Sequence, residues 1–279
     1  MPTVTDGPIV AGPPQGRRRR IHVVGIGSGG LDQITVEAVR ALQASDYAVA
    51  ALKRPGDPLF TRRVELLARH APGLELVGVQ DPERDRSSSS TSTHGDYRGV
   101  VLDWHQARAL AWEQILAERP GDVVIPVWGD PAFYDSTLRI LDRIAERGRV
   151  PIDVRVLPGI SALQVLAARH RLVLHEIGAT ITVTTGRRLR EVVAAGADNV
   201  VVMLNSDLPL DGLDEWHIWW GGNLGDAGEA LVAGRVGDVL DELRAERDRL
   251  RAEHGWVMDV YLLRRGDGRE TERGERTTT

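Results

Sequence analysis

The chain has 279 residues, of which 42% are hydrophobic and 27% are charged, and its formal net charge is −5. This length is enough for two modest domains, and the composition is typical of a globular protein. The absence of cysteine excludes disulfides, thiolate metal sites and cysteine nucleophiles, and it favours a cytoplasmic protein. The acidic balance speaks against nucleic-acid binding, and no apolar run approaches the ~20 residues of a membrane span.

Strand-like and helix-like segments alternate through most of the chain. Short β-branched runs predict strands at 21–26, 46–52, 122–128, 153–157, 179–185, 199–205, 215–220 and 255–263. Helical spacing of apolar residues predicts helices at 32–46, 61–71, 100–118, 134–147, 160–170, 187–196 and 237–254. The alternation predicts an α/β protein with a mostly parallel first sheet, and the consecutive late strands predict a mixed second sheet.

Composition predicts the domain organisation. We expect a disordered leader at 1–20, a first α/β domain at 21–158, a second at 159–264 and a disordered tail at 265–279. The arginines at 17–20 are expected to form a solvated arm, and the polar, serine-rich stretch 81–99 a mobile surface loop. Trp219 and Trp220 end a strand, where they either line a cleft or anchor a dimer interface.

The first candidate motif is the glycine-rich loop Gly25-Ile26-Gly27-Ser28-Gly29-Gly30, directly after the first expected strand. Glycines allow a ligand to approach the backbone closely. The spelling also matches GxGxxG, so a dinucleotide site is an alternative, as is a tight turn without a ligand. A dinucleotide domain needs a carboxylate at the end of its second strand, and here that strand ends in Leu52-Lys53.

The second and third motifs also follow strands. Trp128-Gly129-Asp130-Pro131 lies at the carboxyl end of the most apolar strand, where open α/β sheets bind ligands. Asp130 either accepts hydrogen bonds from a ribose or caps the next helix. Pro158-Gly159-Ile160-Ser161 opens another helix, at which Ser161 is either an N-cap or a ligand contact.

The order and spacing of these motifs, with Ile34-Thr35 at the first helix start and Tyr134 closing the GDPxxY turn, resemble the tetrapyrrole methylase family over about residues 21–263. The resemblance implies two α/β domains with S-adenosylmethionine (SAM) in the interdomain cleft, and usually a homodimer. It implies methyl transfer to a ring carbon, with no metal required. The segments 81–86, 103–109 and 128–141 further resemble a corrin-pathway member that also removes an acetyl group.

Carried over by position, the resemblance implies a set of cofactor-binding residues. Ser28 stands where the family has a proline that touches the cofactor, Asp130 lies near the ribose, and Met203 and Leu204 match the adenine-side apolar position. The implied set is Gly25, Gly27, Ser28, Gly129, Asp130, Pro131, Tyr134, Ser136, Thr137, Ser161, Ala162, Met203, Leu204, Gly222, Asn223 and Leu224. Of these, Tyr134, Ser136 and Thr137 would border the methyl group or the macrocycle.

Loss of the acyl group calls for a general base that activates water. The candidates are Tyr97, Asp103 and His105, and the alternative for Asp103 and His105 is a helix surface or a core pair. A tetrapyrrole substrate carries several carboxylates, which suit arginine forks. The candidate arginines are Arg62, Arg63, Arg84, Arg86, Arg98, Arg108 and Arg139.

Four other functions are weighed against this one. They are methylation at another tetrapyrrole carbon, a methyltransferase of the same fold acting on ribosomal RNA or diphthamide, an NAD(P)-dependent oxidoreductase using the Gly25–Gly30 loop, and a non-catalytic tetrapyrrole carrier. Binding of S-adenosylhomocysteine or of NAD separates the methyltransferases from the oxidoreductase. Turnover separates both from the carrier.

Overall fold

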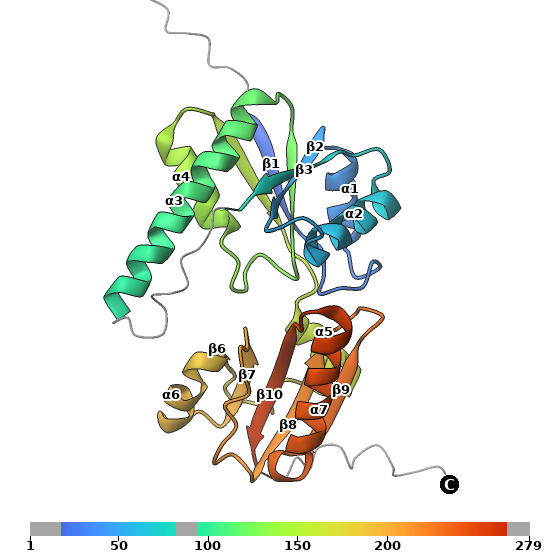
Figure 1. The fold of residues 1–279 in the computed structure, drawn as a ribbon, viewed down its shortest axis with the longest axis vertical. Helices are drawn as coiled ribbons and strands as arrows, with labels where there is room; N and C mark the ends of the chain where they lie inside the picture. Colours follow the sequence, from blue (N-terminus) through green and yellow to red (C-terminus); the bar gives the residue numbers. More distant parts are fainter. Residues whose placement is uncertain (1–17, 82–93, 267–279) are drawn as a thin grey trace, which may run out of the picture. The chain divides into compact units, whose positions relative to one another are not determined.

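The computed structural model describes residues 18–81 and 94–266, apart from the side chains of residues 94–103 (Figure 1). The chain forms two compact units that are not continuous in sequence. The first unit comprises the chain up to Val24, Val39–Pro126 and Tyr134–Leu157. The second comprises Gly25–Ala38, Val127–Phe133 and the chain from Pro158 on. The loops that carry the first two sequence motifs therefore pack with the carboxyl-terminal half.

Five parallel strands form the first sheet, in the order β3-β2-β4-β1-β5. The strands are β1 (Arg19–Gly25), β2 (Tyr47–Leu52), β3 (Leu76–Gln80), β4 (Val123–Val127) and β5 (Ile152–Leu157). The helices between them are α1 (Val36–Gln43), α2 (Pro58–His70), α3 (His94–Glu118) and α4 (Thr137–Arg147). The expected parallel sheet is confirmed.

Strand order fixes where this sheet can bind a ligand. The chain leaves β1 in one direction along the sheet, to β2, and leaves β4 in the other, to β5. Because such crossovers are right-handed, α1 and α2 lie on one face and α3 and α4 on the other, as Figure 1 shows. The neighbours β1 and β4 therefore flank a topological switch point, the usual ligand position in open α/β sheets.

The long helix α3 turns one stripe of side chains inward. His105, Ala109, Trp112 and Leu116 recur every three or four residues, and each is at most 8% exposed. Glu113 is also buried and is neutralised by Arg147, 2.9 Å away on α4. The expected amphipathic helix is confirmed, although it begins at His94 rather than at residue 100.

The second sheet is mixed, with the order β6-β7-β10-β8-β9. β6 (Thr182–Thr185) and β7 (Asn199–Met203) are parallel, whereas β10 (Asp259–Arg265), β8 (Trp216–Gly222) and β9 (Ala230–Arg235) join by antiparallel pairing. The helices are α5 (Ala162–His170), α6 (Leu189–Ala194), which follows the 3-10 turn Gly186–Arg188, and α7 (Val236–His254). The expected mixed sheet is confirmed.

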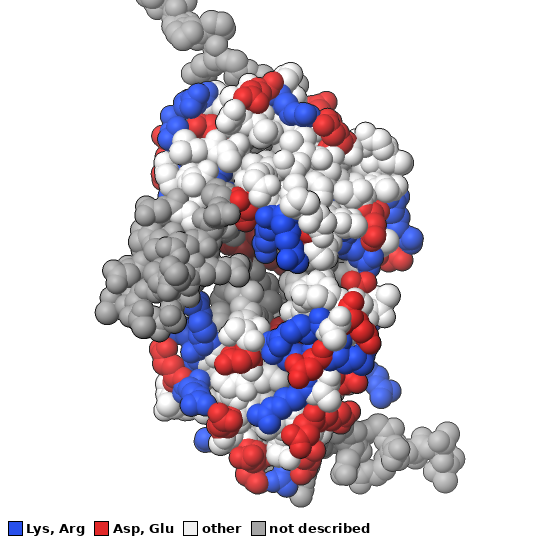
Figure 2. All heavy atoms as spheres, viewed as in Figure 1, with Lys and Arg blue, Asp and Glu red and all other residues white. Residues whose placement is uncertain are grey.

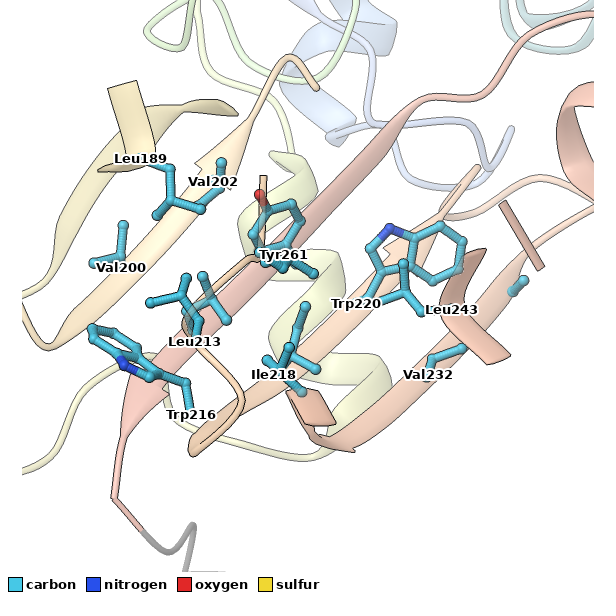
Figure 3. Packing of buried hydrophobic residues seen from close by; sticks show 14 of the residues in the cluster. Leu189, Val200, Val202, Leu213, Trp216, Ile218, Trp220, Val232, Leu243 and Tyr261 are labelled. Carbon is cyan, nitrogen blue, oxygen red and sulfur yellow. The ribbon is translucent and has the colours of Figure 1, made fainter. Parts of the chain in front are cut away.

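Alternate residues of these strands fill two separate cores. Trp220 and Tyr261 are fully buried with aliphatic side chains of β7, β9 and α7 (Figure 3). Trp219 and Leu262, one residue away in each strand, pack on the opposite face with α5. This two-residue period means that Trp220 belongs to the interior, so neither role expected for it, as a cleft wall or as a dimer anchor, is correct.

Both expected tails extend too far into the folded chain. Arg19 and Arg20 begin β1, where they pair with Ile152 and Asp153 of β5, and Arg265 ends β10. Arg20 also forms an ion pair with Asp122 at 2.8 Å. The expected disordered leader and solvated arm are therefore wrong at Arg19 and Arg20, and the expected tail is wrong at Arg265. Residues 1–17 and 267–279 of the two tails, and residues 82–93 of the serine-rich loop, lie outside the described residues.

Sequence reasoning missed two strands, β3 and β9. Both are edge strands of their sheets, and each contains an internal glycine, Gly78 or Gly234. Edge strands are buried on fewer sides and glycine weakens a strand pattern, so neither gives a strong signal.

Charges of both signs are interspersed on the face that Figure 2 shows. On α7, for example, Arg249 contacts Glu246 at 2.8 Å and Glu253 at 2.7 Å. Such exposed pairs each contribute about 0.2–1 kcal/mol, so the fold depends on its cores rather than on them. Within 18–81 and 94–266, no helix combines the length and apolar character needed to cross a membrane.

The core of the second unit predicts a graded response to truncation. Leu243 of α7 is fully buried beside Trp220, whereas Leu231 of β9 is 39% exposed. Leu243→Ala is expected to lower the free energy of unfolding by about 2–5 kcal/mol, because it leaves a cavity. Leu231→Ala, the matched control, is expected to cost less than about 1 kcal/mol. Urea unfolding followed by tryptophan fluorescence measures both, and equal losses would contradict this core.

Candidate active site

The three sequence motifs follow the carboxyl ends of three neighbouring strands of the first sheet. β4, β1 and β5 are adjacent and parallel, so the loops that begin at Trp128, Gly25 and Pro158 all leave the sheet at the carboxyl ends of its strands. Gly27 and Gly129 form an isolated antiparallel bridge, in which the Gly129 amide donates to the Gly27 carbonyl at 2.7 Å. The motifs that are far apart in sequence therefore form one backbone surface.

The carboxylate of Asp130 links two of these loops. Its Oδ1 accepts from the Ala132 amide and its Oδ2 from the Gly159 amide, both at 2.8 Å. The first bond closes a local turn, and the second joins that turn to the loop after β5. Asp130 thus has a structural role that neither expected reading, ribose acceptor or helix cap, described, and its contact with a ribose stays a prediction.

Glycine is required where these loops meet. A Cβ on Gly159 would lie 2.7 Å from the Gly25 Cα, and a Cβ on Gly25 would lie 2.8 Å from the Gly129 carbonyl oxygen. Carbon atoms cannot approach backbone atoms this closely without displacing them. The three backbones are packed to a separation that only glycine permits.

The first loop also rests against the turn after β8. A Cβ on Gly29 would lie 2.7 Å from the Leu224 carbonyl oxygen, and one on Gly225 would lie 2.6 Å from the Gly30 amide nitrogen. Beneath the loop, the Ser28 hydroxyl lies 3.4 Å from Oε1 of Gln33. Ser28 is 7% exposed, so its side chain faces the protein rather than open solvent.

Ser161 caps α5. Its backbone amide donates to Oε1 of Gln164 at 2.7 Å, and its hydroxyl donates to the same oxygen at 2.9 Å. The side chain is buried, and the capping interpretation accounts for it. Ala162 begins the helix, and the contact of both residues with a ligand stays a prediction.

Backbone strain is concentrated at expected site residues. Among the described residues, four other than glycine have positive φ: Tyr134 (53°), Arg171 (55°), Leu204 (54°) and Asn223 (48°). Three of them belong to the set inferred from sequence. Leu204 is also 59% exposed, and a leucine gains nothing from this conformation or from solvent. Strain of this kind is typical of binding sites.

Met203 and Leu224 lie in the core cluster that packs on α5, together with Phe133 of the GDP turn. Asn223 makes two hydrogen bonds with Met258. The Asn223 backbone amide donates to the Met258 carbonyl at 2.8 Å, and the Asn223 Oδ1 accepts from the Met258 amide at 2.9 Å. In the second unit, the expected residues lie in the motif loops, at the start of α5 and at the ends of β7 and β8. They are Gly25, Gly27, Ser28, Gly129, Asp130, Pro131, Ser161, Ala162, Met203, Leu204, Gly222, Asn223 and Leu224.

The other expected residues belong to the first unit. The Ser136 hydroxyl accepts from Arg108 at 3.2 Å, and Arg108 in turn forms a double hydrogen bond with Asp81 at 2.7 and 2.8 Å. Thr137 is the first residue of α4, and its amide donates to Asp135. His105 is 8% exposed, beside Trp104. Tyr97 and Asp103 lie on α3, but their side chains are outside the described residues.

Arg63 fixes the end of β4. Hydrogen-bonded pairing of β4 with β2 stops at Val124, because Pro126 has no amide hydrogen to donate. The Pro126 carbonyl instead accepts from Nε of Arg63 at 2.9 Å. Burial lowers the pKa of the Arg63 guanidinium to about 10, despite the opposing effect of Asp57 and Asp135. The group stays charged at neutral pH.

Several of the arginines considered for substrate carboxylates are thus already engaged. Arg62 pairs with Glu65 at 2.7 Å, while Arg63 and Arg108 make the contacts described above. Arg139 is exposed, and its Nη1 lies 3.5 Å from the Asp135 carbonyl oxygen. Arg84, Arg86 and Arg98 lie outside the described side chains. The described part of the chain holds no cluster of three or more histidine or carboxylate side chains that could bind a metal.

Comparison with known proteins identifies the family of this chain. A family model described as Tetrapyrrole (Corrin/Porphyrin) Methylases matches residues 20–239. The chain belongs to the tetrapyrrole methylase family. The assignment inferred from the three motifs is therefore confirmed.

Relatives within the family are similar over most of the chain. The precorrin-6A synthase [deacetylating] of Sinorhizobium sp. is 37% identical over 254 residues, which span 89% of this chain and 96% of that protein. A crystal structure of a cobalamin-synthesis-related protein (CobF) from Corynebacterium diphtheriae has a TM-score of 0.77 and 35% identity. It covers 90% of this chain and all of that one.

A more distant neighbour is similar in fold alone. Uroporphyrin-III C-methyltransferase from Thermus thermophilus, solved in complex with S-adenyl homocysteine, has a TM-score of 0.54 and 18% identity. It covers 88% of this chain and 96% of its own. The expected fold class, two α/β domains of the tetrapyrrole methylase type, is confirmed.

Sequence reasoning missed the polar residues that support this candidate site. Gln33 contacts Ser28 and Gly30 of the first loop, and Arg247 pairs with Asp259 beside the residues that follow β7 and β8. For Asp259 a signal existed, because it is the one charge within the apolar run from Trp256 to Leu263. A charge in a buried strand requires a buried partner.

The strained backbone at Leu204 predicts opposite changes in stability and binding. Leu204→Gly is expected to keep the Tm at or above that of the wild type, because glycine adopts positive φ freely and little buried area is lost. It is expected to weaken S-adenosylhomocysteine binding, because an exposed apolar contact is removed. Arg171→Gly relieves the same strain at the end of α5, outside the motif loops. It is expected to leave the affinity unchanged, and equal effects of the two variants in calorimetry would oppose a binding role for Leu204.

Proposed function

We propose that this tetrapyrrole methylase is a SAM-dependent C-methyltransferase that converts precorrin-5 to precorrin-6A. The reaction would methylate ring carbon 1 and release acetate, in aerobic cobalamin biosynthesis. One observation carries the proposal: the chain aligns over 89% of its length with a deacetylating precorrin-6A synthase, at 37% identity. The convergence of all three motif loops on one backbone surface supports it.

The residues of this surface fit SAM. Gly129 has no atom within 4 Å of an added Cβ, so a ligand can approach its backbone closely, while Gly25 and Gly159 let the loops beside it pack together. The exposed side chain of Leu204 offers an apolar contact to the adenine. When bound, SAM supplies an electrophilic methyl group on a sulfonium.

The protein's own contribution to methyl transfer is then mainly orientation. A carbon nucleophile and a methyl donor need alignment more than covalent assistance, and effective molarities for aligned groups reach about 10⁵–10⁸ M. Loops joined by Asp130 and by the Gly27–Gly129 bridge are suited to that task because they cannot move independently. Tyr134, Ser136 and Thr137 border the methyl group or macrocycle in this proposal.

Acetate release needs water, and we assign its activation to His105, with Tyr97 and Asp103 as further candidates. His105 is buried on α3 and is one turn from Arg108, which holds Ser136. A neutral imidazole accepts a proton from the attacking water. Of the candidate arginines whose side chains are described, Arg139 is the exposed one, and we assign it to a substrate carboxylate.

We further propose that the protein acts as a homodimer. Strand β5 is an edge strand, and its Val154 and Val156 are 38% and 47% exposed. Parallel edge strands are normally covered, and exposed valines there favour burial against a second copy.

The test joins binding and turnover. Calorimetry is expected to show binding of S-adenosylhomocysteine at micromolar concentration and none of NAD. With precorrin-5 and SAM, mass spectrometry is expected to show one acetate released for each methyl transferred. Binding of NAD alone would favour the alternative function as an oxidoreductase. A methylated product that retains its acetyl group would assign the protein to another tetrapyrrole methylase reaction.

The same assay examines His105. His105→Ala is expected to slow acetate release by about 100-fold or more, the usual contribution of a general base. S-adenosylhomocysteine affinity is expected to stay within about twofold, because His105 belongs to the first unit. His22→Ala is the matched control, since His22 is equally buried, at 7%, on β1. Unchanged acetate release in His105→Ala would remove this residue from the mechanism.

A further inference from the structure

A buried ion pair lies inside the second unit, next to the strained residue Leu204. Nε of Arg247 on α7 lies 2.8 Å from Oδ2 of Asp259 on β10, and their side chains are 7% and 1% exposed. The indole Nε1 of Trp220 donates to the same carboxylate oxygen at 3.1 Å. A carboxylate with a cation and two further donors is fixed in position, because any movement leaves a buried charge without a partner.

The remaining oxygen of this carboxylate holds Asn205. Nδ2 of Asn205 donates to Oδ1 of Asp259 at 3.2 Å and to its carbonyl at 3.3 Å. Nη2 of Arg247 donates to the Asn205 carbonyl at 3.0 Å. Both the side chain and the backbone of Asn205 are therefore bonded to the same ion pair.

Close packing restricts Asn205 from another direction. A Cβ on Gly186 would lie 2.8 Å from Oδ1 of Asn205, so this segment approaches the asparagine as only glycine can. Oδ1 itself is buried and has no hydrogen-bond partner within the described part of the chain. The protein keeps Asn205 in place at the cost of one unsatisfied acceptor, which indicates that its position matters.

The same stretch of β10 also holds the other site loop of this unit. Met258, the residue before Asp259, exchanges two hydrogen bonds with Asn223, and Asp259 pairs with Gly222 on β8. Two adjacent residues, Met258 and Asp259, thus hold Asn223 and Asn205, the residue after Leu204. Leu204 and Asn223, which directly follow β7 and β8, both have positive φ although neither is glycine.

We propose that Asn205, held by Asp259 and Arg247, is a positioning residue for the cofactor that acts through Leu204. By holding the residue after Leu204, the ion pair keeps Leu204 in its left-handed conformation with its side chain exposed. It thereby sets the affinity for the nucleoside part of the cofactor, while leaving the tetrapyrrole part of the reaction unaffected. This inference rests on the proposed function, because it assumes that Leu204 contacts SAM.

The experiment compares two asparagines of the same strand region. Asn199 begins β7; its Nδ2 donates to the carbonyls of Leu174 at 2.9 Å and Thr180 at 3.1 Å, and its Oδ1 accepts from Nε of Arg264 at 3.2 Å. Asn205 follows the end of β7, and its side chain makes the two hydrogen bonds to Asp259 described above. Asn199→Ala therefore removes at least as many side-chain hydrogen bonds as Asn205→Ala, but at the opposite end of β7 from Leu204. Asn205→Ser serves the same comparison if Asn205→Ala does not fold.

Calorimetry with S-adenosylhomocysteine and with 5′-methylthioadenosine separates positioning from stability. Asn205→Ala is expected to raise the Kd of both ligands by the same factor, about tenfold. The KM for SAM is expected to rise by a similar factor, and the KM for the tetrapyrrole is expected to stay unchanged. Asn199→Ala is expected to lower the Tm while leaving both Kd values within about twofold.

Two results would overturn the inference. In one, the two variants lower the Tm similarly and neither changes either Kd by more than about twofold. In the other, Asn205→Ala raises the KM values of both substrates together. Failure of the wild-type protein to bind S-adenosylhomocysteine is a separate outcome, which overturns the proposed function itself.

Discussion

The carboxylate of Asp130 accepts one hydrogen bond from its own turn and one from the Gly159 amide, and the candidate site depends on this pair of bonds. Because β4, β1 and β5 are parallel neighbours, the loops after them begin side by side at the carboxyl ends of the strands. Neighbouring starting points alone do not fix the conformation of these three glycine-containing loops. Asp130 fixes the loops after β4 and β5, because hydrogen bonds to a charged acceptor are stronger than neutral ones, and the Gly27–Gly129 bridge joins the loop after β1 to them. The glycines then allow the linked backbones to touch.

The second sheet contributes its part of the site by a different device. There the fixed point is the buried Arg247–Asp259 pair, and the residues that directly follow β7 and β8, Leu204 and Asn223, are strained. The strain at these two residues is offset by the packing of Trp220 and Tyr261 and by the hydrogen bonds that the Asp259 carboxylate accepts. A binding surface assembled in advance loses less conformational entropy when the ligand arrives.

The sequence predicted the strands, the sheet types and the loops of the site, because apolar periodicity and glycine spacing are local properties. It could not predict the partner of Asp130, since the bond to Gly159 spans 29 residues and depends on strand order. It missed β3 and β9, whose edge positions weaken their patterns. Trp219 and Trp220 were treated alike, although strand alternation sends them to opposite faces, and only pairing of β8 with β10 fixes which face each takes.

The residues that hold the site loops in place were the part of the site that the sequence predicted least. Gln33, Asn205 and Asp259 carry no motif, and their roles follow from contacts between segments far apart in the chain. A resemblance to a family identifies the residues that contact a ligand more readily than the residues that hold those contacts in position. Asp259 was nevertheless visible as a lone charge in an apolar strand, a pattern that predicts a buried ionic partner.

The central claim is that three glycine-packed loops, joined through Asp130 and the Gly27–Gly129 bridge, form the cofactor site. It is tested most directly by the affinity of Gly159→Ala for S-adenosylhomocysteine, measured by calorimetry beside Gly148→Ala. Gly148 ends α4 with no atom within 4 Å of an added Cβ, whereas Gly159 would press against Gly25 and Gly129. The account predicts an affinity more than about tenfold weaker for Gly159→Ala alone. An unchanged affinity in a folded Gly159→Ala protein would contradict it.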